Sequence, residues 1–357
     1  MKLRRSLLIA LLLLGVIAAG AWLARTQISL AIAARVVRAH LGVDLATQLP
    51  DGLHVGVCGA GSPFPDDLRL GPCTAVLAGK RLFVFDAGSG SARNIGKLGF
   101  LAGQVEGVFL THFHSDHIDG LGELLLQRWI QGGHTRPPVV TGPEGVEQVV
   151  AGFVQAYTLD RGYRVEHHGD ATVPASGFGA TARAFKGGET TVLLKEGDLE
   201  ISAFPVQHDP VHPSVGYKIR YKDRSLVLSG DTHKSPAVLA AARGVDLLVH
   251  EALSAPMVDV LRDGAKASGR DRMVKLFDDI KDYHASPVEA AETARDAGVR
   301  YLLLNHIVPT IPPLPGLEGY FLGEAPKVFG GPVRVARDGD FLSLPVGTQE
   351  IRVTRRF

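Results

Sequence analysis

Hydrophobic and polar positions divide the chain into an apolar N-terminal run and a longer region in which short apolar runs alternate with turns. No residue from Leu7 to Ala24 is charged, and this run is near the ~18 residues that can span a bilayer. The apolar spacing in residues 26–41 predicts an amphipathic helix. We therefore divide the chain into an N-terminal membrane anchor or signal segment (1–25), an amphipathic linker (26–50) and one globular domain (51–357).

Short runs rich in β-branched and other apolar residues, bounded by Gly, Pro and Asp, predict the strands of this domain. They lie at 53–58, 74–78, 82–86, 107–111, 199–206, 215–222, 225–231, 246–252 and 299–306. Apolar residues spaced three and four apart predict helices, including 119–133 and 287–298. In both halves, strands come first in groups and then alternate with helices. This order predicts two mixed sheets packed face to face with helices outside.

Two segments do not follow this pattern. Residues 160–190 are Gly-rich with scattered charge, and residues 308–332 are rich in Pro, Gly and aromatic residues. Long irregular segments in compact domains are often functional loops or lids. We expect the loop that begins at Val308 to form part of a pocket wall, with Tyr320 and Phe321 suited to an aryl or other apolar group.

The N-terminal run follows a basic start, MKLRR. A basic start before an apolar run fits a signal peptide, for which Ala19-Gly20-Ala21 offers a cleavage site, or an uncleaved anchor. We favour the anchor because the run is long for a signal peptide. The cationic residues on its two sides slightly favour a cytoplasmic tail. The expected location is therefore membrane-anchored or secreted, with the domain on the periplasmic or extracytoplasmic side.

Composition adds two points. The formal net charge of +1 argues against a dedicated nucleic-acid binder, which usually carries a basic face. The two cysteines, Cys58 and Cys73, each lie at the edge of a strand-like run. In an exported domain they could form a disulfide, and two small buried thiols are the other interpretation.

The stretch THFHSDH carries the chemistry of the chain. It places His112, His114, Asp116 and His117 within six positions, between a predicted strand and a predicted helix. Residues i and i+2 of an extended chain point the same way, so His112 and His114 can converge on one ion. Asp116 and His117 are adjacent and could serve a second ion. Imidazole and carboxylate together suit zinc, and also manganese or iron.

Three more potential ligands lie farther along the chain. His208, Asp231 and His306 each follow an apolar run, so each should project from the same edge of a sheet. Alone, each could simply cap a turn. Together with the first stretch they make seven ligands, which is enough for two ions if Asp231 bridges them.

THFHSDH, an isolated histidine, GDT and a terminal histidine together resemble the metallo-β-lactamase superfamily over about residues 53–306. The resemblance implies a four-layer αββα sandwich and two divalent ions, with zinc first and manganese or iron as alternatives. It assigns His112, His114 and His208 to one ion, Asp116, His117 and His306 to the other, and Asp231 to both.

Two stretches, VHEAL and YHASPVEAA, are similar to the ribonuclease Z branch, which also contains arylsulfatase-like and phosphodiesterase-like enzymes. The resemblance implies that Asp116, Glu251 and His284 take part in catalysis. A bridging hydroxide would attack the ester, His284 would donate a proton to the leaving oxygen, and Glu251 would orient His284. Asp86 could hydrogen-bond a ligating histidine or serve only its turn. We expect His233 and His250 to be structural.

The expected substrate is a small phosphodiester or aryl sulfate ester. Residues 160–190 contain few clustered Lys and Arg residues, so a basic arm that grips transfer RNA is not expected and nucleic acid is a disfavoured partner. The membrane, through the N-terminal helix, and a second copy in a homodimer are the other expected partners. A transfer-RNA 3′-end endonuclease of the ribonuclease Z type is the main alternative. A lactonase and a non-catalytic, membrane-tethered metal-binding scaffold are two further ones.

Overall fold

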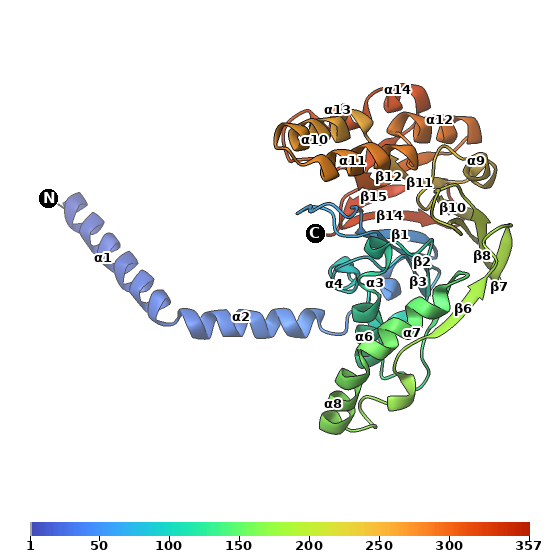
Figure 1. Ribbon diagram of the computed structural model, residues 1–357. Helices are drawn as coiled ribbons and strands as arrows, with labels where there is room; N and C mark the ends of the chain where they lie inside the picture. Colours follow the sequence, from blue (N-terminus) through green and yellow to red (C-terminus); the bar gives the residue numbers. More distant parts are fainter. Residues whose placement is uncertain (1) are drawn as a thin grey trace. The chain divides into compact units, whose positions relative to one another are not determined.

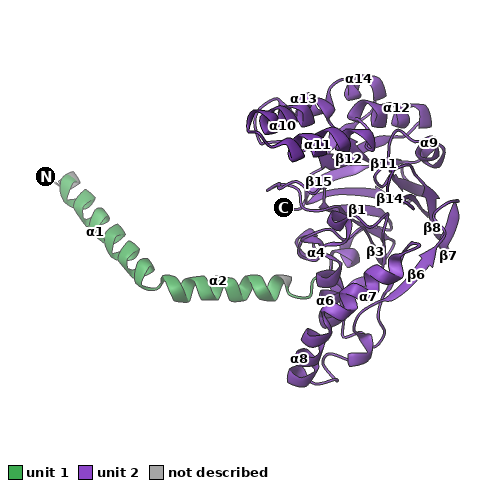
Figure 2. Cartoon of the chain, in the orientation of Figure 1, with its two compact units in different colours: residues 1–44 green, residues 45–357 purple. Residues whose placement is uncertain are grey.

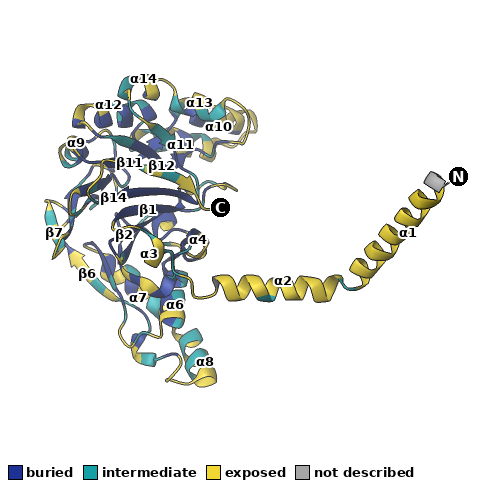
Figure 3. Ribbon diagram, turned by 180° about the vertical axis from the view of Figure 1, so that it is seen from behind, coloured by how far each residue is buried: buried dark blue, intermediate teal, exposed yellow. Residues whose placement is uncertain are grey.

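The computed structural model describes residues 2–357, and the chain separates into two compact units at residues 44 and 45 (Figure 2). The first unit holds α1 (Lys2–Leu23) and α2 (Arg25–His40). Within the described chain, α1 is the one helix that is long and apolar enough to cross a membrane, and it is not buried against other parts of the protein (Figure 3). The short helix α3 (Leu45–Gln48), inside the predicted linker, belongs to the second unit.

Across residues 45–357, the first sheet of the second unit has the strand order β15-β14-β1-β2-β3-β4-β5-β6. Its strands are β1 (Gly52–Gly59), β2 (Cys73–Ala78), β3 (Arg81–Phe85), β4 (Val105–Phe109), β5 (Val139–Pro143), β6 (Thr181–Phe185), β14 (Asp340–Pro345) and β15 (Arg352–Arg355). β14 pairs antiparallel with β1, from Gly52 opposite Pro345 to Gly56 opposite Phe341. The C-terminal segment, which the sequence pattern left unassigned, thus returns to the first sheet.

The second sheet has the order β13-β12-β11-β10-β9-β8-β7. Its strands are β7 (Thr191–Glu196), β8 (Leu199–Pro205), β9 (Val215–Tyr221), β10 (Arg224–Leu228), β11 (Leu247–Leu253), β12 (Tyr301–Val308) and β13 (Val333–Val335). Strands β10 to β13 are parallel, whereas β7 to β10 are antiparallel. Both sheets are therefore mixed, as predicted.

Helices cover the outer face of each sheet (Figure 1). The helices that pack outside the first sheet are α3, α4 (Ser91–Leu98), α5 (Ser115–Ile118), α6 (Leu121–Gly132) and α7 (Val146–Ala156), while α8 (Thr158–His168) follows α7 and has no buried residue. Those beside the second sheet are α9 (Pro236–Ala242), α10 (Ala255–Ala267), α11 (Asp271–Asp279), α12 (Pro287–Ala297), α13 (Leu317–Leu322) and α14 (Ala325–Phe329). The predicted four-layer αββα sandwich is confirmed.

The strands are apolar almost throughout because both faces of each sheet are covered. On β1, Leu53, Val55 and Val57 point into the core between the sheets. On β2, Val76 joins that core while Leu77 packs in the cluster that includes residues of α4 and α6. Alternate residues of one strand thus fill two different cores, as the two-residue period of a strand requires. Burial is densest in these layers (Figure 3).

The two irregular segments are more regular than predicted. Residues 158–168 form α8, and 181–185 form β6 at the edge of the first sheet. The segment 308–332 contains α13 and α14. These two helices have only 6 and 5 residues, and each ends at a Gly, so the Gly and Pro signals around them dominated the sequence pattern.

Candidate metal centre and pocket

The stretch THFHSDH follows β4, as predicted, but its last three residues lie in the short helix α5, which the sequence pattern did not predict. His112 and His114 lie in the connecting loop, and Asp116 and His117 lie in α5. The Nε2 atom of His112 is 3.0 Å from the Nδ1 atom of His114, so these two side chains converge. The α5 backbone turns Asp116 and His117 toward a neighbouring point, because a helix begins directly after His114.

The downstream residues reach the same place from the second sheet. His208 follows β8, Asp231 follows β10, and His306 lies in β12. His306 has a positive φ of 45° and coincides with a register shift between β11 and β12. A bulge of this kind redirects a side chain, and a non-glycine residue rarely adopts this backbone conformation. The strand therefore departs from regular geometry at the residue that faces the cluster.

One group of four ligand atoms comes from His112, His114, His208 and Asp231, which lie within 4.8 Å of one another. The Nε2 atoms of His112 and His208 are 3.9 Å and 3.8 Å from Asp231 Oδ2. His208 Nε2 is also 3.4 Å from His114 Nδ1. Such spacings suit donors that share an ion at bond lengths of about 2.0–2.1 Å.

A second group comes from Asp116, His117 and His306. His306 Nε2 is 3.3 Å from Asp116 Oδ2, and His117 Nε2 is 3.6 Å from it. Both nitrogens also approach Asp231 Oδ2, at 3.3 Å for His117 and 3.2 Å for His306. One carboxylate oxygen of Asp231 thus faces both groups.

The chemistry of these groups fits divalent cations. His112, Asp116, His117, His208, Asp231 and His306 are buried, and the buried Nε2 atom of His117 has no hydrogen-bond partner. A buried polar atom without a partner is costly unless something binds it. Neutral imidazole and carboxylate are ligands that zinc, manganese and iron accept. The seven residues could hold two ions, with Asp231 shared.

The electrostatics of the cluster point the same way. Burial raises the pKa of Asp231, but His306 and His117 outweigh burial and hold this pKa well below its usual value. Burial lowers the pKa of His117, but the carboxylates of Asp231, Asp86 and Asp116 outweigh it and raise this pKa well above its usual value. The carboxylates therefore stay charged and attract positive charge to the cluster.

Neighbouring groups fix the orientation of the histidines. Asp86, at a positive φ of 56°, lies with Oδ2 2.9 Å from His117 Nδ1 and accepts the backbone N–H of Thr111 at 2.8 Å. His208 Nδ1 lies 3.0 Å from the carbonyl oxygen of Tyr283. A partner on the second ring nitrogen fixes the tautomer and leaves Nε2 free to bind. Asp86 thus contacts a potential ligand as well as closing its turn.

Glu251 and His284 form a second buried pair beside the cluster. Glu251 Oε1 accepts the backbone N–H groups of Thr232 and Ala285 and lies 3.1 Å from His284 Nδ1. Because Glu251 Oε1 acts as an acceptor for these two donors, we infer that His284 Nδ1 carries a hydrogen and is the third donor. A nitrogen of His284 lies within 4.8 Å of the ligand atoms of Asp231 and His306. The cap of α12 is Ser286, with a capping box to Glu289, so His284 does not cap that helix.

An open pocket lies over the cluster. Its polar surface comes from His114, Ser115, Asp116, Asp231, His284 and His306, and its apolar surface from Pro63, Phe64, Ile280, Tyr283 and Val308. The prediction that Tyr320 and Phe321 line the pocket is wrong. Phe321 is buried in the core under the second sheet, packed with the α12 side of the molecule, and Tyr320 is 56% exposed outside the pocket.

The sequence did not predict that Phe64 and Tyr283 line the pocket. Tyr283 is adjacent to His284 and contacts His208, with ring centroids 4.7 Å apart, so its position in YHASP was an available signal. Phe64 lies in SPFPDD between two prolines, and nothing local indicates which surface such a loop faces. Both lie near the cluster through tertiary contacts alone.

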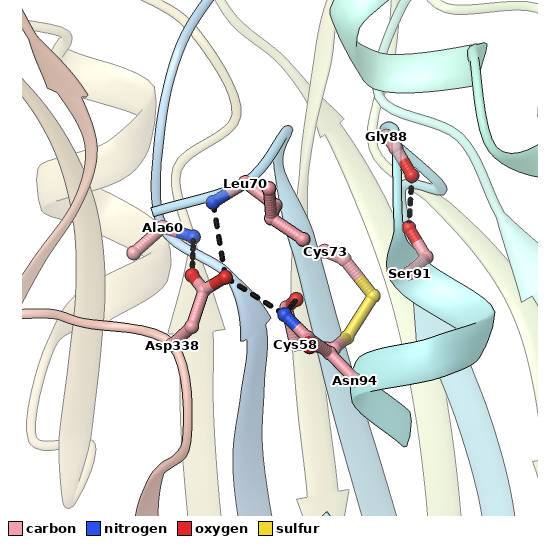
Figure 4. Close-up of a disulfide and its surroundings, with 8 residues drawn as sticks. All are labelled: Cys58, Ala60, Leu70, Cys73, Gly88, Ser91, Asn94 and Asp338. Atoms are coloured by element: carbon pink, nitrogen blue, oxygen red, sulfur yellow. Dashed lines mark hydrogen bonds between the residues drawn. A yellow bond between two sulfur atoms is a disulfide. The ribbon is translucent and has the colours of Figure 1, made fainter. Parts of the chain in front are cut away.

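Cys58 and Cys73 form a disulfide between β1 and β2 (Figure 4). Of the two alternatives, the pair of buried thiols is therefore wrong. The bond closes the loop of residues 59–72, which carries Pro63 and Phe64. The disulfide thus lies at the base of one pocket wall.

Two curated proteins with similar sequences are named ribonuclease Z. The chain is 36% identical over 263 residues to the ribonuclease Z of Mycolicibacterium gilvum, across 73% of this chain and 86% of that protein. It is 34% identical over 288 residues to the ribonuclease Z of Mycobacterium marinum, across 80% of this chain and 96% of that protein. The similarity thus extends over most of the second unit.

Solved structures show the same fold. The metallo-beta-lactamase fold protein YhfI from Bacillus subtilis superposes with a TM-score of 0.58 and 22% identity, across 82% of this chain and all of that one (100%). The short form of human tRNase Z gives a TM-score of 0.55 and 21% identity, with the same coverage of 82% and 100%. Residues 66–306 match the sequence pattern of the Metallo-beta-lactamase superfamily. The chain therefore belongs to the Metallo-beta-lactamase superfamily and is a metal-dependent hydrolase of that fold.

Proposed function

We propose that this protein is a phosphodiesterase with a two-metal centre. The observation that carries the proposal is the position of Asp231 Oδ2, which lies 3.2–3.9 Å from nitrogens of both ligand groups. A carboxylate in this position would be shared by the two ions of a two-metal hydrolase. When bound, the ions would supply an activated water and neutralise charge on the phosphate oxygens.

The proposed reaction breaks one P–O ester bond, forms a P–OH bond with the oxygen of water, and transfers a proton to the leaving oxygen. His284 is the proposed proton carrier, and Glu251 is its positioning residue. Burial lowers the pKa of His284 to about 4, so the ring is neutral at neutral pH. With the Nδ1–H held by Glu251, Nε2 is available to take the proton from water and pass it to the leaving oxygen. Asp116 is proposed as a metal ligand at the pocket floor.

RNA is the first substrate to test, because the curated relatives are named ribonuclease Z. A tRNA 3′-end endonuclease therefore has better support than the arylsulfatase hypothesis, which rests on the resemblance alone. A small phosphodiester is the second candidate. The lining of the pocket favours this small substrate. Among the lining residues in the described chain none is Lys or Arg, and affinity for a polyanion such as RNA usually depends on these cations.

We propose that α1 anchors the protein in a membrane. The helix from Arg4 to Leu23 has a mean hydropathy of 2.5. The disulfide supports a location of the domain outside the cytosol, because disulfides are rare in the reducing cytosol. Release of the protein from washed membranes by detergent but not by high salt would test the anchor. Precursor transfer RNA as substrate would conflict with an exported domain, so the location of the domain and the identity of the substrate test each other. A homodimer stays a prediction.

The deciding experiment uses the full chain in detergent, loaded separately with zinc, manganese and iron(II). The panel contains precursor transfer RNA, bis(p-nitrophenyl) phosphate, p-nitrophenyl sulfate and a lactone. We expect hydrolysis of phosphodiesters, lost on chelation and restored by metal. Hydrolysis of the sulfate or the lactone alone, or of nothing by metal-loaded protein, would contradict the proposal.

A further inference from the structure

The pocket wall above the ligand cluster is apolar and aromatic. It comes from three separate segments: Pro63 and Phe64 from the loop 59–72, Ile280 and Tyr283 from the segment after α11, and Val308 at the end of β12. The floor is formed by charged and polar side chains, so one pocket combines a polar floor with an apolar wall. A substrate that fills it has to present a charged group below and an uncharged group above.

The two aromatic residues are held from behind. Phe64 is half-buried and stacks on Phe277 of α11, with ring centroids 6.1 Å apart and planes 16° apart. Tyr283 is also half-buried, and its ring meets His208 edge to face at 83°. Each ring therefore has one packed side, while the remaining surface faces the pocket. Such rings offer flat contact area with little loss of conformational entropy.

The loop that carries Phe64 is fixed at both ends. The Cys58–Cys73 disulfide joins its two bases. Asp338 accepts the backbone N–H groups of Ala60 and Leu70, each at 3.0 Å, and also the Nδ2–H of Asn94 at 2.7 Å (Figure 4). These contacts position the ring before any ligand arrives, which lowers the entropic cost of binding.

Two further bonds join this loop to the second sheet and the C-terminal segment. The Ser62 hydroxyl donates to the carbonyl oxygen of Ile307 at 3.0 Å, next to His306. Arg69 Nε donates to the carbonyl oxygen of Ala336 at 2.8 Å. Arg69 is buried and used in this contact, so it is not a cation available to a second phosphate. The wall thus favours an uncharged group over an anionic one.

We propose that Phe64 and Tyr283 bind a flat, uncharged ring carried by one ester group of the phosphodiester. This inference rests on the proposed phosphodiesterase function and names the substrate class. The shared chemistry is a planar ring, which an aryl ester or a nucleobase can supply, because both stack on aromatic side chains. Contacts of this kind contribute about 0.5–1.5 kcal/mol, which corresponds to about a 2- to 10-fold change in KM or Kd.

The test compares two esters with the same leaving group, p-nitrophenyl phenyl phosphate and p-nitrophenyl methyl phosphate. Both carry the p-nitrophenyl ring on the leaving oxygen, so the ring under test is the one on the ester group that stays on phosphorus, which only the phenyl ester has. Phe64→Leu keeps apolar volume but removes the ring. We expect its KM for the phenyl ester to rise about 2- to 10-fold with little change in kcat, and its KM for the methyl ester to stay near the wild-type value. Tyr283→Leu should act in the same direction. An oligoribonucleotide and its counterpart with an abasic 3′ residue distinguish a nucleobase from an aryl ring.

Tyr320→Leu is the matched control, because it removes an aromatic ring that lies outside the pocket, and we expect no change in either KM. Binding of phenylphosphonate and methylphosphonate, measured by calorimetry, tests the ring site without turnover. If the metal-loaded wild type hydrolyses neither ester but prefers phenylphosphonate in a Phe64-dependent way, the ring site stands and the proposed function fails. Equal effects of Phe64→Leu on both esters and both phosphonates, in folded protein with full metal content, overturn the ring site.

Discussion

The floor and the wall of the pocket differ in how the chain builds them. The floor rests on the seven potential ligands: four lie within residues 112–117, and the other three each lie at or just after a strand of the second sheet. The wall is assembled from a loop, the segment after α11 and the end of β12, at residues 63, 64, 280, 283 and 308, which share no motif. The floor is common chemistry that suits attack on an ester. Discrimination between different esters would therefore depend on the residues of the wall.

This contrast predicts that changes in the floor damage every substrate equally, whereas changes in the wall act selectively. Asp231→Asn is expected to have the largest effect, because it removes the one charge that faces both ligand groups. Metal content should fall, and kcat/KM should fall by about 10³-fold or more for phenyl and methyl esters alike, since metal ions contribute several kcal/mol to the transition state. Elemental analysis and steady-state kinetics measure the two effects. Asp209→Asn, an exposed carboxylate after His208, is the control and should leave both unchanged.

His284→Ala should affect turnover without removing metal. We expect kcat to fall about 10²- to 10³-fold on both esters, as for loss of a group that transfers protons, with metal content and thermal stability close to wild type. The exposed His212 provides a matched control in His212→Ala. Loss of metal in His284→Ala, or unchanged kcat, would show that His284 has a different role.

The disulfide offers a change at the base of the loop that carries Phe64. Replacing Cys58 and Cys73 by Ser opens a crosslink that spans 15 residues, and loss of such a bond is expected to cost about 3 kcal/mol in the free energy of unfolding. At temperatures where the variant stays folded, KM for the phenyl ester should rise more than KM for the methyl ester. Denaturant unfolding and kinetics with a reducing agent check this. A fall in the metal content of the same variant would instead show that the disulfide supports the ligand cluster.

The smallest expected effect comes from Asp338, at the other fixed end of the same loop. Burial raises the pKa of its carboxyl from 3.8 to about 6, against the lowering effect of its three donors. A raised pKa in the folded state means that Asp338 stabilises the fold fully below pH 3.8 and loses that contribution as the pH rises through about 6. Because the side chain is only half-buried, we expect a loss of about 1–2 kcal/mol.

Asp338→Asn should remove this pH dependence. The unfolding free energies of the wild type and of Asp338→Asn are measured at pH 4.5 and at pH 7. The change in their difference between the two pH values reports the titration of Asp338, because the lost hydrogen bonds affect both pH values alike. An unchanged difference would show that Asp338 does not titrate in this range. Asp340, which is buried between Arg334 and Arg355, is unsuitable as a control because it is already paired.

The sequence by itself determined the layers and the floor. Most strands could be predicted from apolar runs, because both faces of each sheet are covered. The potential ligands could be predicted because clusters of His and Asp are rare next to such runs. The side chains form two groups beside Asp231, and their role as ligands of two ions stays a prediction. Glu251 and His284 were found through the short stretches VHEAL and YHASP, and the hydrogen bond between them agrees with the predicted pairing.

Only the tertiary structure decided the wall. The aromatic residues near His306 in sequence, Tyr320 and Phe321, turn away because α13 packs its apolar side into the core of the second sheet. Phe64 is 242 positions before His306 in the chain, yet both line one pocket. A ligand motif is local because a metal needs several donors within a few ångströms, whereas an apolar wall can be supplied by any segment that reaches the site. The fold therefore had to be known before the residues that choose the substrate could be named.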